Sequence, residues 1–208
     1  MNIIREACVG SVEQAMIAEK RKADRVELCS RLDLDGLTPD RKIIERTMNL
    51  LSIPVKVMIR PKSGNFIYSK QDILKMESEI DFCKKIGVSE VVFGMLNENS
   101  EVDIELTSAI AKKAAPMDIT FHKAIDRVND MKHGLERLSN VKEITSILTS
   151  GGKDSALNGQ DIIKDIIKQF SSRFNIIAAG GITDENLNLV HSCIGGTEYH
   201  GKRIVGQL

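Results

Sequence analysis

Polar and sulfur-containing side chains gather near the ends of eight short apolar runs of this 208-residue chain. In α/β folds with parallel strands, ligands bind at the carboxyl ends of the strands, so these side chains are the first candidates for chemistry. The candidates are Glu6, Cys8, Glu27, Cys29, Met58, Arg60, His122, Thr149, Ser150, Glu198 and His200. Because strand side chains alternate between two faces, each of the three glutamates shares a face with the cysteine or histidine two residues later.

The glutamates have possible partners of opposite charge at the same end of the sheet. Glu6, Glu27 and Glu198 are expected to face Arg60, His122 and His200. Charges inside an apolar barrel are costly unless they pair or bind a ligand. Two interpretations stay open. One is a structural ion-pair network. The other is a catalytic set of Glu27, Arg60, His122, Glu198 and His200, in which His122 with Glu27 or Glu198 performs acid–base chemistry.

Two cysteines are candidates for a metal site. Cys8 and Cys29 end adjacent predicted strands, which lie about 4.8 Å apart in a sheet. Soft thiolates suit Cu(I), which accepts few ligands, and Met58 on the third strand can add a thioether, whereas Zn(II) prefers four ligands and more histidine. The alternative is that both cysteines are small buried apolar residues. Cys83 and Cys193 fall in helical patterns and are expected to pack.

Two consecutive strand-like runs, 144–149 and 175–179, are followed by paired glycines. Glycines at this position allow a ligand to approach the backbone, and the N–H groups of such loops and of a following helix often hold an anion. The predicted anion-binding residues are Thr149, Ser150, Gly151, Gly152, Gly180 and Gly181. The helix predicted to open near Asp184 would point its N-terminus there, although Asp184 itself can cap those amides. Ordinary strand-to-helix turns are the alternative.

The elements that position these residues alternate strictly between strand and helix. Strands are predicted at 3–8, 25–29, 55–60, 90–94, 119–122, 144–149, 175–179 and 197–200, and helices at 12–22, 40–51, 70–86, 103–115, 130–138, 159–170 and 184–193. This alternation predicts a parallel sheet, and eight strands in 208 residues favour a single (β/α)8 barrel (TIM barrel) domain over residues 1–208. Only residues 201–208 follow the last strand, so the final outer helix is missing or reduced, which leaves a flank for a partner subunit.

The amino-acid composition limits the classes of function and the compartment that we expect for this protein. Lys and Arg total 29, as do Asp and Glu, so the zero net charge gives no support to nucleic-acid or acidic-membrane binding. No run approaches the roughly 18 apolar residues of a membrane span, and we expect no signal peptide. Four widely spaced cysteines without a CxxC motif indicate reduced thiols in a cytoplasmic protein.

Several of these motifs together resemble the CutC family of copper homeostasis proteins. They are RVELC (25–29), VMIRPKSGNFIY (57–68), VFGMLN (92–97), TFHKAID (120–126), LTSGG (148–152), AGGITDEN (179–186) and EYH (198–200). The resemblance covers about residues 6 to 200 and implies a cytoplasmic, often dimeric (β/α)8 barrel that binds Cu(I) through rim cysteines, here Cys8 and Cys29. The chain departs from longer members at its C-terminus, where their final helical region is lacking.

Three hypotheses of function follow. The first is a Cu(I)-binding homeostasis protein that uses Cys8 and Cys29, with no organic cofactor. The second is an enzyme that acts on a small phosphorylated or carboxylated metabolite, in which the glycine loops hold the anion and Arg60 clamps it. The third is a non-catalytic scaffold. A homodimer or higher homo-oligomer is expected, and neither a nucleic acid nor a membrane is expected as a partner.

Overall fold

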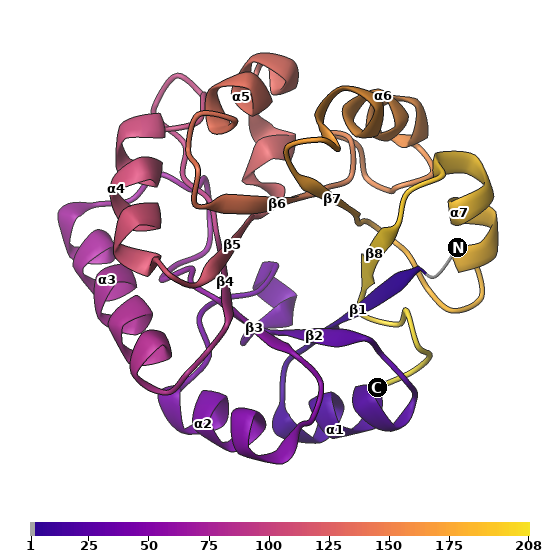
Figure 1. Cartoon of the computed structure of the whole chain (residues 1–208), viewed down its shortest axis with the longest axis horizontal. Helices are drawn as coiled ribbons and strands as arrows, with labels where there is room; N and C mark the ends of the chain where they lie inside the picture. Colours follow the sequence, from indigo (N-terminus) through magenta and orange to yellow (C-terminus); the bar gives the residue numbers. More distant parts are fainter. Residues whose placement is uncertain (1–2) are drawn as a thin grey trace.

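Eight parallel strands close into a barrel in the computed structural model, which describes residues 3–208 (Figure 1). The strands are β1 (Ile4–Val9), β2 (Arg25–Leu28), β3 (Val55–Met58), β4 (Glu90–Phe93), β5 (Asp118–Phe121), β6 (Ile144–Thr149), β7 (Asn175–Ala178) and β8 (Glu198–Gly201). They are hydrogen-bonded in chain order, and β8 pairs with β1. The (β/α)8 barrel predicted from the alternating pattern is confirmed.

Seven α-helices surround the described barrel (Figure 1). They are α1 (Val12–Lys20), α2 (Arg41–Leu50), α3 (Lys70–Lys85), α4 (Ile104–Ala114), α5 (Met131–Leu138), α6 (Gln160–Phe170) and α7 (Leu187–Ile194), and two 3-10 turns, η1 (Leu32–Leu34) and η2 (Lys123–Arg127), lie above the strands' carboxyl ends. Ser69 begins α3 with a capping box, since its hydroxyl accepts from the Asp72 N–H while the Asp72 carboxylate accepts from the Ser69 N–H. Side-chain caps of this kind set where the helices begin.

The last helix starts later than the sequence pattern predicts. We expected it from residue 184, but α7 begins at Leu187 with Asn186 as its N-cap. The Asn186 carboxamide oxygen accepts from the Thr183 N–H, and its amide group donates to the Gly181 carbonyl oxygen. These bonds hold residues 181–186 in a turn, so Asp184 does not cap α7.

The barrel closes without an eighth outer helix among the described residues. β8 pairs directly with β1, with Glu6 opposite His200. The tail after β8 then runs toward α1, where the Arg21 guanidinium donates to the Val205 carbonyl oxygen, and Figure 1 shows the C-terminus beside α1. Ile204 and Val205 are buried, so this short segment covers part of the flank that an eighth helix would cover.

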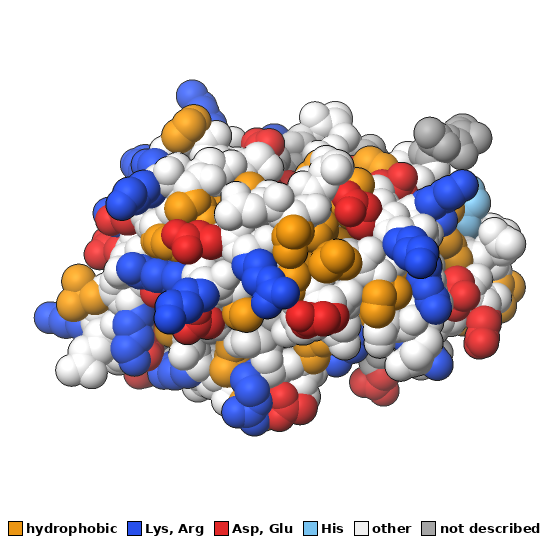
Figure 2. All heavy atoms as spheres, turned by 90° about the horizontal axis from the view of Figure 1, so that it is seen from below, with side chains coloured by type: hydrophobic (Ala, Val, Ile, Leu, Met, Phe, Trp, Pro, Cys, Tyr) orange, Lys and Arg blue, Asp and Glu red, His pale blue; other side chains and the backbone are white. Residues whose placement is uncertain are grey.

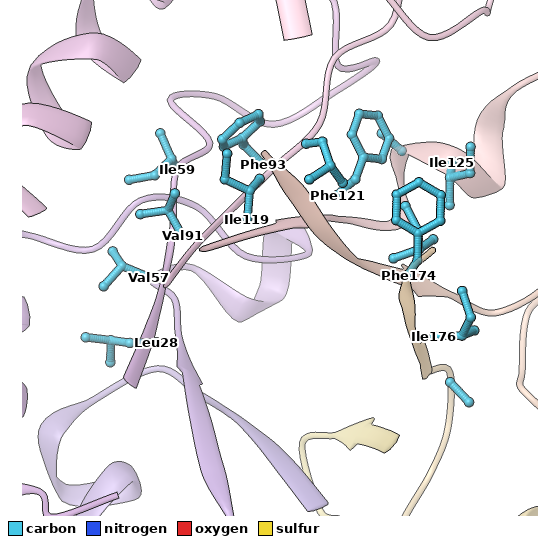
Figure 3. Close-up of a cluster of buried hydrophobic side chains, with 14 of the residues drawn as sticks. Leu28, Val57, Ile59, Val91, Phe93, Ile119, Phe121, Ile125, Phe174 and Ile176 are labelled. Atoms are coloured by element: carbon cyan, nitrogen blue, oxygen red, sulfur yellow. The ribbon is translucent and has the colours of Figure 1, made fainter. Parts of the chain in front are cut away.

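The main apolar core lies between the strands and the outer helices, as Figure 3 shows for ten labelled side chains. Val57, Val91 and Phe93 are fully buried there, on the strand faces that point away from the barrel axis. Side chains of the opposite parity point inward. Within the described part of the chain they form two small apolar clusters, one of Cys8, Cys29, Met58 and Val92 and the other of Leu148, Ile177 and Ala179. The remaining interior is polar and charged, which is unusual for a packed parallel barrel and points to function.

Candidate ligand and metal site at the barrel mouth

A network of ion pairs fills the lower interior of the barrel around Glu6, which is fully buried. The Lys56 Nζ lies 3.0 Å from Glu6 Oε2 and 2.7 Å from Glu90 Oε1, and it donates to the Thr120 hydroxyl oxygen at 3.0 Å. Arg25 bridges Glu6 and Glu198 through its guanidinium group. Every buried charge of this network therefore has an opposite charge within ion-pair distance, which makes its burial tolerable.

The expected pairing of the three glutamates is only partly present. His200 does pair with Glu6, at 2.8 Å between Nδ1 and Oε1. Arg60 and His122 make no ion pair with the three glutamates among the described residues; Arg25 and Lys56, which the sequence analysis did not select, neutralise Glu6 instead. The register explains this, because Arg25 is opposite Glu6, whereas Arg60 lies beyond the end of β3. The alternation of side chains along a strand could have identified Arg25 and Lys56 from the sequence. Arg25 shares a strand face with Glu27, and Lys56 shares one with Arg60.

Glu198 lies in this lower network and not at the mouth. Its carboxylate oxygen accepts a hydrogen bond from Arg25. Glu198 is not among the residues that line the cavity at the barrel mouth. The structure therefore brings Glu27, Arg60, His122 and His200 together around one cavity and keeps Glu198 away from it.

Two buried thiols lie above the ion-pair network. The thiols of Cys8 and Cys29 both donate to Glu27 Oε2, at 3.6 and 3.3 Å, and the three ligand atoms lie within 4.8 Å of one another. Met58 packs against both cysteines in the same cluster. A Cβ at Gly36 would lie 3.1 Å from the Cys29 sulfur, and Gly36 has a φ of +84°, so only glycine fits comfortably at this point of the β2–α2 connection.

The two thiols differ in their ionisation. The neighbouring Cys29 thiol, with a smaller contribution from His200, holds the pKa of Cys8 well below its ordinary value. The neighbouring Cys8 side chain, together with burial, raises the pKa of Cys29. Burial also raises the pKa of Glu27 to about 8. Of the two thiols, Cys8 is therefore the one that ionises more readily.

His200 connects the thiol pair to the ion-pair network. Its Nδ1 bonds to Glu6 Oε1, and its Nε2 faces Glu27 Oε2 at 3.8 Å. Burial opposes the imidazolium charge, but Glu27, Cys8 and Glu6 together raise the pKa of His200 well above its ordinary value. A carboxylate that orients a histidine beside a thiolate is an arrangement used both for metal ligation and for acid–base catalysis.

The backbone positions of the two cysteines do not suit a disulfide. The Cα partner of Cys8 in the β1–β2 ladder is Glu27, and Cys29 is two residues further along. With strands about 4.8 Å apart and about 3.3 Å per residue, the two Cα atoms are separated by roughly 8 Å, beyond the span of a disulfide without backbone movement. All four cysteines are free. The pair is thus a dithiol able to share a ligand between its sulfur atoms.

A cavity of about 620 Å³ opens above the thiols at the carboxyl ends of the strands. Cys8, Glu27 and His200 line its floor, and Arg60 and His122 line its wall. Phe66 lies between the last two, 4.7 Å from the Arg60 guanidinium and 4.9 Å from the His122 ring. Phe66, which sequence reasoning did not select, is thus part of the wall.

The first glycine loop holds a carboxylate of the protein itself. Asp126 accepts hydrogen bonds from the N–H groups of Ser150 and Gly152 and from the hydroxyls of Thr149 and Ser150, at 3.2 Å or less. Asp184 was expected to compete for the amides of the helix that follows the second loop, but the carboxylate that occupies loop amides is Asp126, near the end of η2, at the first loop. An external anion would have to displace Asp126 from Thr149, Ser150 and Gly152. Gly180 and Gly181, in the second loop, line the cavity.

Fold and site together define a (β/α)8-barrel protein with a buried thiol–carboxylate–imidazole cluster at the floor of its mouth. The CutC family model matches residues 3–205. A human protein named copper homeostasis protein cutC homolog is 41% identical over 197 residues, which are 95% of this chain and 72% of the human protein. The chain belongs to the CutC family. An Aliivibrio fischeri relative, a family protein CutC, is 37% identical over 202 residues, 96% of this chain and 81% of its own length.

Solved structures agree with this assignment. A CutC protein from Streptococcus agalactiae superposes with a TM-score of 0.92 at 29% identity, over 97% of this chain and 99% of that one. Phosphoribosylanthranilate isomerase from Thermotoga maritima has a TM-score of 0.60 at 15% identity over 96% of this chain and 86% of that one, a similarity that shows only the shared barrel fold.

Proposed function

We propose that this protein binds Cu(I) through the sulfur atoms of Cys8 and Cys29. The observation that supports the proposal most directly is two sulfur atoms and a Glu27 oxygen within 4.8 Å of one another, in a buried cluster that also contains Met58. Soft sulfur ligands and few donors are what Cu(I) prefers, and burial protects such an ion from water and oxidants. His200, held by Glu6, lies beside the cluster and contributes to the lowered pKa of Cys8.

A competition assay with a Cu(I) chelator tests this site. Cys29→Ser and Cys8→Ser are each expected to weaken Cu(I) binding by more than about 100-fold, since loss of a residue that only supports a ligand already costs about 10–100-fold. Cys193→Ser is the matched control, because Cys193 is a half-buried cysteine on α7 outside the cluster. Unchanged affinity in the Cys8→Ser/Cys29→Ser double variant would rule the thiol site out.

A second proposed function is an enzyme that acts on a small phosphorylated or carboxylated metabolite. The cavity of about 620 Å³ favours it, because a single metal ion needs far less room, and ligand pockets for organic molecules have about this size. Glu27 and His200 on its floor can exchange protons with a bound molecule. Incubation with mixtures of organic acids and phosphate esters, followed by NMR, should reveal turnover that Glu27→Gln abolishes; no conversion of any member would count against this function.

We also propose a homo-oligomer in the cytoplasm. Four free cysteines fit a reducing compartment. No described helix is long and apolar enough to cross a membrane. The face with α1 and α2, seen in Figure 2, mixes charges of both signs with apolar side chains, and Met16, Ile17 and Leu50 are exposed large apolar residues of these helices. Sedimentation velocity should give a mass above that of the 23.0 kDa chain; a monomer at all concentrations would refute the oligomer.

A further inference from the structure

We propose that the mouth cavity binds a small organic anion whose charged group is held by Arg60 and His122. This inference deepens the second proposed function, since it assigns the groups that would hold the substrate in the same cavity. It is independent of the thiol pair, because neither residue belongs to the cluster of Cys8, Cys29 and Glu27.

Arg60 is a buried cation without a counter-ion. Its side chain is 4% exposed, and its Nη atoms donate only to the neutral carbonyl oxygens of Leu34, Gly36 and Gly64. Among the residues that the structure describes, no carboxylate lies within ion-pair distance of it, whereas Arg25 and Lys56 each have two. Its Nε has no partner either. A buried charge of this kind is costly unless a ligand supplies the opposite charge.

His122 adds an unpartnered hydrogen-bond donor to the same wall. Its Nδ1 accepts from the Ala124 N–H at 3.2 Å, which leaves the proton of the neutral ring on Nε2. Nε2 is buried and has no hydrogen-bond partner within residues 3–208. Burial, with a contribution from the Arg60 charge, lowers the pKa of His122 to about 3, so the ring is neutral at physiological pH. The ring packs against Gly94, where a Cβ would lie 2.6 Å from Nδ1, and it cannot easily turn away.

Charge at the opening favours an anion over a cation. Six arginines and lysines line the cavity, against four aspartates and glutamates, although the whole chain has no net charge. Arg127, Lys153 and Lys202 are exposed at the rim, where they can attract an anion toward the buried Arg60. Asp126 already occupies the donors of the first glycine loop, so the Arg60–His122 wall is the better place for the charged group.

The rest of the cavity indicates that the anion is organic. Leu32, Phe66, Leu148, Ala179 and Ile182 give apolar surface on several sides, which an inorganic ion cannot use. At the floor, Glu27 Oε1 is buried and has no hydrogen-bond partner among the described residues, so it can pair with a polar group of a ligand. The ligand class that fits is a small carboxylate or phosphate monoester that also carries a hydroxyl group, which can donate or accept a hydrogen bond at Glu27.

Binding can be measured with four probes on the full-length protein labelled with ¹⁵N-histidine: acetate, inorganic phosphate, malate and glycerol 3-phosphate. We expect malate or glycerol 3-phosphate to shift the His122 Nε2 signal with a millimolar or lower Kd, and more tightly than acetate or phosphate. Which of the two binds distinguishes a carboxylate from a phosphate ligand. No shift with any probe up to about 20 mM, well above the expected millimolar Kd, would overturn the proposal.

Variants locate the charged group. Arg60→Gln is expected to weaken binding of the tighter probe at least tenfold, and Arg60→Lys to restore part of it, while Lys62→Gln, an exposed cation of the same loop outside the cavity, should change it little. His122→Leu removes the donor and provides a second test if Arg60→Gln does not fold. Equal affinity in wild type, Arg60→Gln and His122→Leu would refute the site.

A further variant separates this proposal from the copper proposal. The Cys8→Ser/Cys29→Ser variant should still bind the probe, so the anion site can be present even if the copper proposal fails. If a probe binds but none is converted, the result would count against the proposed enzymatic function and not against the binding site.

Discussion

Lys56 carries its charge in the middle of the barrel, where it is 1% exposed and paired with Glu6 and Glu90. Burial alone would raise the pKa of the Glu6 carboxyl, but Lys56, His200 and Arg25 together hold it well below its ordinary value. The stability of the barrel therefore depends on a partner of opposite charge for each buried charge. Substitution of a single residue in this network can remove such a partner.

Lys56→Met is expected to destabilise the protein by about 3–5 kcal/mol, because it leaves the buried Glu6 and the half-buried Glu90 short of a cation. The free energy of unfolding from urea titration measures the effect. Lys62→Met is the matched control, since Lys62 is exposed and its partner Asp72 keeps its hydrogen bonds from Ser69, so the expected loss is less than about 1 kcal/mol. A similar small loss in both variants would show that the interior network contributes little.

His122 makes a pH-dependent prediction at the same scale. Its pKa of about 3 in the folded state lies below the value near 6.5 of an unfolded histidine. Between these values the unfolded chain binds more protons, so His122 lowers stability as pH falls below 6.5, by up to about 1.4 kcal/mol per pH unit.

The comparison of wild type with His122→Leu isolates this contribution from the carboxylates. Urea unfolding from pH 7 to pH 4.5 should show wild type losing more stability than the variant, which has no group to protonate at this position. Parallel pH profiles would mean that His122 is accessible to protons in the folded protein.

Among the elements, η2 and the loop after β6 depend on one another through Asp126. The carboxylate accepts from the Ser150 and Gly152 N–H groups and from the Thr149 hydroxyl, so it occupies the donors that an external anion would use. The signal for this was available in the sequence, because Asp126 closes the TFHKAID motif, but its distance from the loop in the chain gave no reason to pair them.

Removing this carboxylate should create an anion site. We expect Asp126→Ala to bind inorganic phosphate at the vacated amides, with selective shifts of the Ser150 and Gly152 amide signals at millimolar phosphate that wild type lacks. Asp154→Ala is the control, since Asp154 is an exposed carboxylate of the same cavity. Shifts in wild type equal to those in Asp126→Ala would place a phosphate site in this loop despite Asp126.

At the scale of the molecule, closure of the sheet makes the barrel one unit. Every strand pairs with two neighbours, including β8 with β1, so no group of strands has a core of its own. The sequence predicts a single domain over residues 1–208, and we expect one cooperative unfolding transition by circular dichroism and by fluorescence of the tyrosines. Two separate transitions, or a stable proteolytic half-barrel, would contradict a single domain.

The sequence by itself determined the local elements and their order. Apolar runs of four to six residues alternating with capped amphipathic helices predict the barrel, because crossover handedness and strand number leave few other folds. The alternation of strand side chains placed Cys8 on the same face as Glu6 and Cys29 on the same face as Glu27. The paired glycines marked two loops that contribute residues to the mouth.

Only the tertiary structure decided which of these residues meet. The closed register puts Arg25 and Lys56 against Glu6, sets Glu198 below the mouth and leaves Arg60 without a counter-ion, and none of this follows from spacing along the chain. Asp126 fills the first glycine loop from 24 residues away for the same reason. Contacts across a barrel depend on strand stagger and loop path, which are set by the packing of the whole molecule rather than by local sequence.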